Sequence, residues 1–79
     1  MSELGKKVLS ALLIVGAQSR EMSESAAHLA SRLELQAGSL EKDLRDLQAK
    51  GYVILFEKDG TLMVYLTTIG IVTASSTYS

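Results

Sequence analysis

Apolar residues recur at helical spacing in the first fifty residues of the chain. Residues 3–18 predict a helix, because four apolar side chains three or four positions apart form one face. The members of that face are Leu4, Val8, Leu12 and Val15. Leu9 and Leu13 fall outside it, at positions where a single-faced surface helix carries polar residues. We therefore expect this helix to be covered on two sides.

Two further helices are predicted over residues 23–33 and 37–49, joined by the short segment 34–36. Ser23 is suited to cap the first of them, because a serine hydroxyl accepts a hydrogen bond from a free N–H at a helix start. The buried stripe of this helix consists of Ala26, Leu29, Ala30 and Leu33. The apolar face of the next helix consists of Leu40, Leu44 and Leu47. Gly51 follows it and is suited to the left-handed backbone that ends many helices.

Two apolar runs that flank the dipeptide Asp59-Gly60 predict a β-hairpin. This dipeptide favours a two-residue type I′ turn, in which both central residues have positive φ. The register set by the turn pairs Lys58 with Thr61, Phe56 with Met63, Ile54 with Tyr65 and Val53 with Leu66. Both faces of the hairpin are then apolar, whereas a hairpin that lies on a core alternates apolar and polar positions. We therefore expect something to pack on the second face as well.

The end of the chain predicts a short C-terminal helix. Residues 68–76 have room for one or two helical turns, and the polar tail 75–79 is expected to fray. Prolines and low-complexity linkers are absent. We therefore expect a single domain over residues 1–79, with its core at 5–74.

Composition limits how so small a core can be stabilised. A domain of this size buries only about 60% of its unfolded surface. Cysteine is absent and there is one histidine, which excludes disulfides, thiolate metal sites and a multi-histidine site within one chain. We expect no metal or other cofactor, and oligomerisation remains as the means of stabilisation.

Charge and hydropathy limit the classes of partner that the chain is expected to bind. Eight Lys and Arg residues oppose nine Asp and Glu, so any affinity for nucleic acid depends on where individual cations lie. The longest apolar run, residues 8–17, has about half the length that spans a bilayer, and it lacks the context of a signal peptide. We expect a soluble, cytoplasmic protein that does not bind membranes.

No catalytic constellation is found in the sequence. There is no cysteine and no glycine-rich phosphate loop, and nothing places a serine beside His28. His28 falls outside the buried stripe of its helix, and we expect it to be exposed and without a role. The chain is therefore not expected to be an enzyme.

Three segments of the chain resemble, in their order and spacing, segments of a known family: AAHLASRLEL, AGSLEKDLRDLQAKGYV and YLTTIG. In this order they resemble the winged helix-turn-helix family of small transcriptional regulators found in bacteria and archaea. The resemblance covers residues 5–74. It implies a mainly helical α+β fold with three helices, a two-stranded β-hairpin wing and a short C-terminal helix.

The same resemblance implies sequence-specific binding of double-stranded DNA. The third helix, residues 37–49, would enter the major groove, and the wing would reach the backbone or the minor groove. The DNA contacts implied are Gln36, Ser39, Lys42, Arg45, Lys58 and Ser23. Family members are often homodimers joined through their first and last helices. The interface residues implied here are Leu9, Leu13, Ile69 and Val72.

Acidic residues in the third helix leave an alternative open. Glu41, Asp43 and Asp46 interleave with the basic residues. Glu41 is spaced to pair with Arg45, and Asp46 with Lys50, and each such pair stabilises a helix by a few tenths of a kcal/mol. The helix face would then be self-neutralised and solvated. The alternative function is a winged-helix module that binds another protein in a larger assembly and does not bind DNA.

Overall fold

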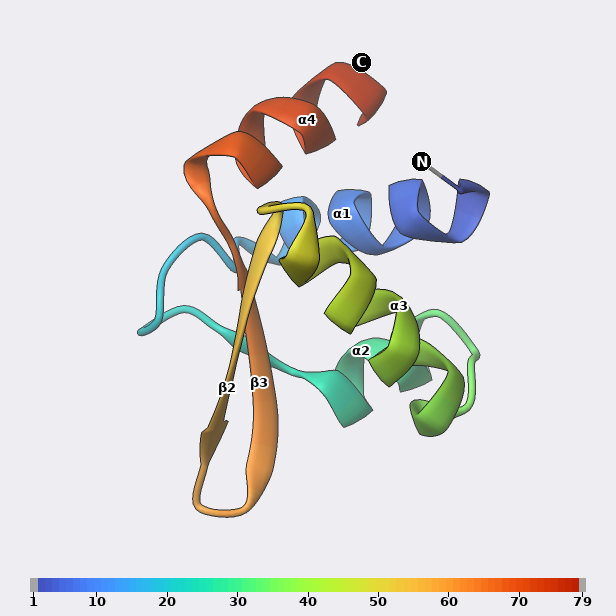
Figure 1. Cartoon of the computed structure of the whole chain (residues 1–79), viewed down its shortest axis with the longest axis vertical. Coiled ribbons are helices and arrows are strands. Elements are labelled where there is room, and N and C mark those ends of the chain that lie inside the picture. The colour runs from blue at the N-terminus through green and yellow to red at the C-terminus, as the bar shows by residue number, and fades with distance from the viewer. Residues whose placement is uncertain (1, 79) are drawn as a thin grey trace.

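The computed structural model describes residues 2–78, apart from the side chains of Ala37 and Tyr78. Its elements are α1 (Glu3–Val15), β1 (Glu24–Ser25), α2 (Ala26–Arg32), α3 (Ala37–Ala49), β2 (Val53–Lys58), β3 (Thr61–Leu66) and α4 (Thr68–Tyr78). Helices α1, α2 and α3 pack together, the hairpin β2–β3 projects from them, and α4 lies beside α1 (Figure 1). The strands form one antiparallel sheet in the order β1-β3-β2.

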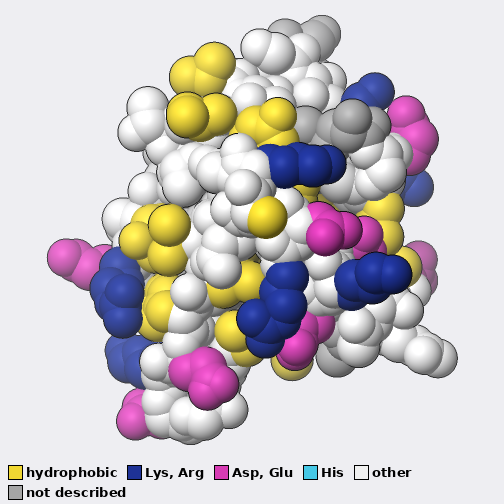
Figure 2. Space-filling model, viewed as in Figure 1, with side chains coloured by type: hydrophobic (Ala, Val, Ile, Leu, Met, Phe, Trp, Pro, Cys, Tyr) yellow, Lys and Arg dark blue, Asp and Glu magenta, His cyan; other side chains and the backbone are white. Residues whose placement is uncertain are grey.

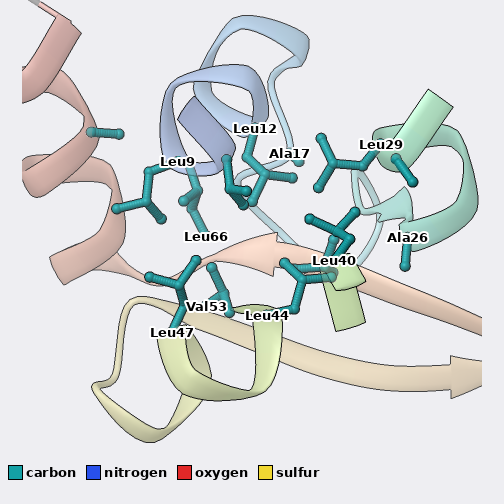
Figure 3. Close-up of a cluster of buried hydrophobic side chains, with 14 residues drawn as sticks. Leu9, Leu12, Ala17, Ala26, Leu29, Leu40, Leu44, Leu47, Val53 and Leu66 are labelled. Atoms are coloured by element: carbon teal, nitrogen blue, oxygen red, sulfur yellow. The ribbon is translucent and has the colours of Figure 1, made fainter. Parts of the chain in front are cut away.

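One cluster of buried aliphatic side chains joins the helices to the base of the hairpin (Figure 3). Leu40, Leu44 and Leu47 of α3, which the sequence predicts as its apolar face, are all buried. They meet residues of the other helices and of both long strands: Val8, Leu9, Leu12, Leu29, Val53, Val64 and Leu66. No polar or charged side chain among the described residues is buried, so hydrophobic burial and close packing hold this cluster together.

Helix α1 ends earlier than predicted and is covered by its own chain. Gly16 adopts a φ of 77°, and this left-handed backbone stops the helix at Val15 instead of residue 18. The prediction that Leu9 is an interface residue is wrong. Leu9 is fully buried, because α4 packs along this side of α1 (Figure 3). The expectation of two covered sides is confirmed, and α4 supplies the second cover.

Helix α2 begins later than predicted, and the predicted capping role of Ser23 is wrong. Ser25 caps α2 instead, since its hydroxyl accepts a hydrogen bond from the His28 N–H at 3.0 Å. Ser23 lies in the preceding loop, where its hydroxyl donates to the Arg20 carbonyl oxygen at 2.8 Å. Glu24 and Ser25 form the strand β1, which pairs with β3. Two residues are too few to show a strand periodicity in the sequence.

The hairpin has the predicted register in all of its pairs. Asp59 and Gly60 have φ values of 52° and 79°, as a type I′ turn requires. One face of the hairpin base, with Val53, Val64 and Leu66, is buried beneath the helices. The opposite face is covered in part by the loop that joins α1 to β1, which confirms the expectation of a second cover only partly.

A backbone junction ties the start of the hairpin to the start of α4. The Thr67 N–H donates to the Tyr52 carbonyl oxygen at 3.0 Å, and the Thr67 hydroxyl donates to that of Gly51 at 2.6 Å. The same hydroxyl accepts from the Gly70 N–H at 3.0 Å and so caps α4. A Cβ on Gly70 would lie 1.9 Å from the Tyr52 carbonyl oxygen. Packing at this junction therefore accounts for the threonine and the glycine of the segment YLTTIG.

Helix α4 is longer than predicted. It runs for 11 residues to Tyr78, so residues 75–78 are helical and not frayed, while Ser79 lies outside the described residues. Ala74 is fully buried in the common core. This packing stabilises the end of α4, residues 75–78, which is too short and polar to form a helix alone. None of the helices within residues 2–78 has the length and hydropathy needed to cross a membrane.

Replacing Gly70 should destabilise the fold strongly. We expect Gly70→Ala to lower the free energy of unfolding by about 1–3 kcal/mol, because the added methyl group overlaps the Tyr52 carbonyl. Gly38→Ala is the control, since a Cβ there meets no atom within 4 Å and alanine favours a helix. Urea unfolding followed by circular dichroism measures both at equal protein concentration. Equal stability of the two variants would contradict the close contact at Gly70.

The two candidate caps of α2 can be separated by mutation. Ser25→Ala should lower the free energy of unfolding by about 1 kcal/mol, because it removes the acceptor for the His28 N–H. Ser23→Ala should change it by less than about 0.5 kcal/mol, since it removes one exposed loop hydrogen bond. Thermal unfolding compares them, and a larger loss for Ser23→Ala would place the helix start at the earlier serine.

Candidate nucleic-acid interface

The face of α3 opposite its buried leucines is open to solvent. Four polar residues lie at intervals of three from the start of α3 onward, and all are exposed: Gln36, Ser39, Lys42 and Arg45. Lys42 and Arg45 lie opposite the leucines, whereas Gln36 is exposed because it stands at the start of the helix. Positions three apart form one ridge on a helix, so the structure brings the four predicted contacts together. Gln36 is the N-cap residue, but its side chain makes no capping hydrogen bond. Each of these side chains carries a hydrogen-bond donor, and we call the four residues the α3 ridge.

Charges of both signs are interspersed over the part of the surface formed by α3 (Figure 2). Arg45 Nη2 lies 3.1 Å from Glu41 Oε2, and Arg45 Nε lies 3.3 Å from the same oxygen, which confirms the predicted pair. The predicted pair of Asp46 with Lys50 is absent from the ion pairs of the described chain. Lys42 has no ion-pair partner within residues 2–78. It is therefore the cation of the α3 ridge that is free to meet an anion.

Helix α2 presents a second polar surface, which the sequence did not predict. His28 Nδ1 lies 2.9 Å from Glu24 Oε1, and Arg32 Nε lies 3.9 Å from Glu24 Oε2. The Glu24 side chain is only 14% exposed, so the carboxylate anchors both α2 side chains to the strand β1. His28 is exposed, as predicted, but it has a partner. Glu24 and His28 are four positions apart, and this spacing is the sequence signal that could have predicted their pairing, although Glu24 lies in strand β1 and not in the helix.

The wing carries Lys58 in an exposed position next to its turn. Behind it, the Arg20 guanidinium lies over the Phe56 ring, with Cζ 4.0 Å from the ring centroid. These residues line an open hollow of about 370 Å³ together with Glu21 and Glu57. The two cations and two anions of this hollow cancel, so it does not form an anion site by itself. No local pattern in the sequence predicts that the loop and the strand meet here.

The predicted interface residues fall into two groups. Leu9 is buried within the chain, and Leu13 packs in part against the core. Ile69 and Val72 are 60% and 62% exposed on α4, and Ile14 of α1 is 61% exposed. Since α1 and α4 lie side by side, these three exposed residues belong to the same pair of helices.

The described residues contain no cluster of metal-ligating side chains. Within residues 2–78, no group of three or more His, Asp or Glu side chains is placed to hold a metal. The polar side chains of the α3 ridge and the wing are suited to donate hydrogen bonds to an anionic partner.

Comparison with known proteins gives matches at the level of structure. No family model and no curated protein matches the chain. It is similar to TubR from Bacillus megaterium pBM400, with a TM-score of 0.90 and 18% identity over 99% of this chain and 87% of that one. A mutant of MarR from E. coli, solved with operator DNA, has a TM-score of 0.81 and 22% identity over 99% of this chain and 54% of that one. The MepR–DNA complex of S. aureus has a TM-score of 0.82 and 19% identity over 96% and 60%.

The extent of these matches defines what the chain shares with the known structures. It spans most of the TubR chain, but only about half of the MarR chain and 60% of the MepR chain. The similarity includes the three-helix core, the hairpin and α4, since nearly all of this chain is covered. The expected architecture is confirmed: the chain has the winged helix-turn-helix fold, with α3 as its third helix and β2–β3 as its wing.

Proposed function

We propose that the protein binds double-stranded DNA sequence-specifically as a small transcriptional regulator. The observation that carries this proposal is the α3 ridge, which is fully exposed on a fold that MarR and MepR share and that has been solved with DNA in both. In this arrangement α3 enters the major groove and the wing lies on the backbone or the minor groove. A regulator of this kind acts in the cytoplasm, where bacterial and archaeal DNA lies.

The chemistry of the α3 ridge fits base and phosphate recognition. Arg45 and Lys42 can donate to guanine or to phosphate oxygens, and Gln36 can bond bidentately to adenine. Arg45 must exchange Glu41 for a DNA acceptor. The pair with Glu41 is solvent-exposed, and such pairs contribute at most about 1 kcal/mol, so this exchange is inexpensive. Lys58 adds an exposed cation on the wing, which makes a second contact on the duplex.

We further propose that two copies form a homodimer through α1 and α4. Ile69, Val72 and Ile14 leave an apolar surface on these helices that one chain does not cover. Burying it stabilises a domain whose core is small for its length. A two-fold dimer also presents two copies of α3 to half-sites about 34–36 Å apart, one turn of DNA. Leu9, which is buried in the monomer, takes no part in this interface.

A module that binds another protein is the second candidate. It is favoured by the composition of α3, which carries Glu41, Asp43 and Asp46 against the two cations Lys42 and Arg45. Such a surface attracts a polyanion weakly. Salt dependence separates the two candidates, because DNA binding releases counterions and weakens steeply with salt, whereas an apolar protein contact does not.

The α3 ridge can be tested directly with a labelled duplex pool in fluorescence anisotropy at about 50 and 200 mM salt. We expect Arg45→Ala and Lys42→Ala each to weaken binding by about 5- to 100-fold, because each removes a base or phosphate contact. Lys7→Ala is the control, because it removes one positive charge from an exposed position on α1, and it should change binding by less than about twofold. Circular dichroism should show all three variants folded.

Two results of this experiment would decide against parts of the proposal. Unchanged binding by both α3 variants would remove α3 from the DNA interface. Absence of any salt-dependent binding by the unmutated protein would leave the protein-binding module as the function.

The homodimer predicts a specific response to charge on α4. Val72→Glu should convert the dimer to a monomer, because a carboxylate buried at the interface has no partner. Met22→Glu is the matched control, since Met22 is 61% exposed on the α1–β1 loop, outside this surface. Sedimentation or light scattering measures the mass of each. A dimer that persists in Val72→Glu, or that is lost equally in Met22→Glu, would place the interface elsewhere.

A further inference from the structure

The base and the tip of the wing are supported differently. At the base, Val53, Val64 and Leu66 are buried, and β1 pairs with β3 as far as Met63. Beyond that point, residues 57–61 are exposed, and Lys58 lies among them. Leu62 of β3 is half-buried and packs against the core, whereas the last residues of β2 with contacts outside the hairpin are Leu55 and Phe56. Whatever holds these two residues of β2 determines where the tip points.

One support reaches the wing from α3. The Gln48 side-chain oxygen accepts a hydrogen bond from the Leu55 backbone N–H. Leu55 belongs to β2, which is an edge strand, so this N–H has no strand partner on its outer side. Gln48 lies one position beyond the buried Leu47, near the end of the helix that carries the α3 ridge. The bond therefore links the backbone of the wing directly to that helix.

A second support reaches the adjacent residue from the α1–β1 loop. The Arg20 guanidinium stacks on the Phe56 ring, which also meets the Tyr65 ring edge-on at a centroid distance of 6.0 Å. The loop that carries Arg20 is anchored at both ends. The Ala17 carbonyl oxygen accepts from the Leu66 N–H at 2.8 Å, and Glu24 pairs with Val64. Both ends of the loop that carries Arg20 are thus tied to β3.

We infer that Gln48 and Arg20 are positioning residues that aim the wing relative to α3. They hold neighbouring residues of β2 from two different elements, just before this strand becomes exposed at Glu57. The inference rests on the proposed DNA binding, since it concerns where Lys58 meets the duplex. Neither side chain needs to contact DNA for this role. Their loss lets the tip swing and weakens the contribution of Lys58.

A double-mutant cycle tests this coupling in DNA binding. Gln48→Met and Phe56→Leu remove the two supports without changing charge, and Gln18→Met is the matched control, because the Gln18 side chain has no partner in the described chain. Lys58→Ala is combined with each of them. We expect Lys58→Ala to weaken binding by about fivefold in the unmutated protein and in Gln18→Met, but by less than about twofold when either support is missing.

The same variants are compared without DNA. Backbone order parameters from ¹⁵N relaxation should fall at Asp59 and Gly60 in Gln48→Met and Phe56→Leu, and stay unchanged in Gln18→Met. Thermal unfolding of each variant confirms that the fold is retained.

The outcomes separate the inference from the proposed function. An equal effect of Lys58→Ala in all backgrounds, or no effect in the unmutated protein, overturns the inference and leaves DNA binding by α3 intact. If the unmutated protein binds no DNA, the proposed function fails. The order parameters then decide whether Gln48 and Arg20 position the wing, and unchanged values at Asp59 and Gly60 overturn that as well.

Discussion

The burial of three leucines on one side of α3 determines most of what the molecule can do. Leu40, Leu44 and Leu47 are inserted between the other helices and the base of the hairpin. Because each position of a helix has a fixed direction, burying these three leucines turns Lys42 and Arg45 of the α3 ridge to the opposite, exposed side. The same contacts set α3 against β2, so the helix and the wing are oriented by one core. A change that rotated α3 would lose both the core and the interface.

The small size of this core explains how the rest of the chain is arranged. α4 covers the side of α1 that contains Leu9, and the α1–β1 loop covers part of the outer hairpin face with Arg20. Both segments also contribute to the core, through Ala74 of α4 and Ala17 of the loop. Ile69 and Val72 of α4 are left exposed, and an apolar surface of this kind favours association with a second molecule.

Features that depend on neighbours in the sequence could be predicted, and features that depend on distant contacts could not. The leucine spacing of α3 and the Asp59-Gly60 turn gave the helix bounds and the strand register correctly. The position of Leu9 could not be predicted, because the helical period does not show that α4 will pack there. The strand β1 and the supports from Gln48 and Arg20 also join residues far apart in the chain. For the candidate site, the α3 ridge was therefore predictable, while the orientation of the wing was not.

The balance of charge on α3 makes the geometry of the wing more important for DNA binding. Attraction between a basic surface and phosphates is the same for every sequence, and it supplies most non-specific affinity. Here Glu41 already occupies Arg45, and the acidic residues of α3 offset its cations. In the proposed DNA binding, non-specific attraction is therefore weak, and discrimination depends on contacts that form only when the helix and the wing fit one site together. In the proposed complex, a wing held at two adjacent residues keeps Lys58 in register with α3, which adds affinity for the correct site without strengthening the general attraction to DNA.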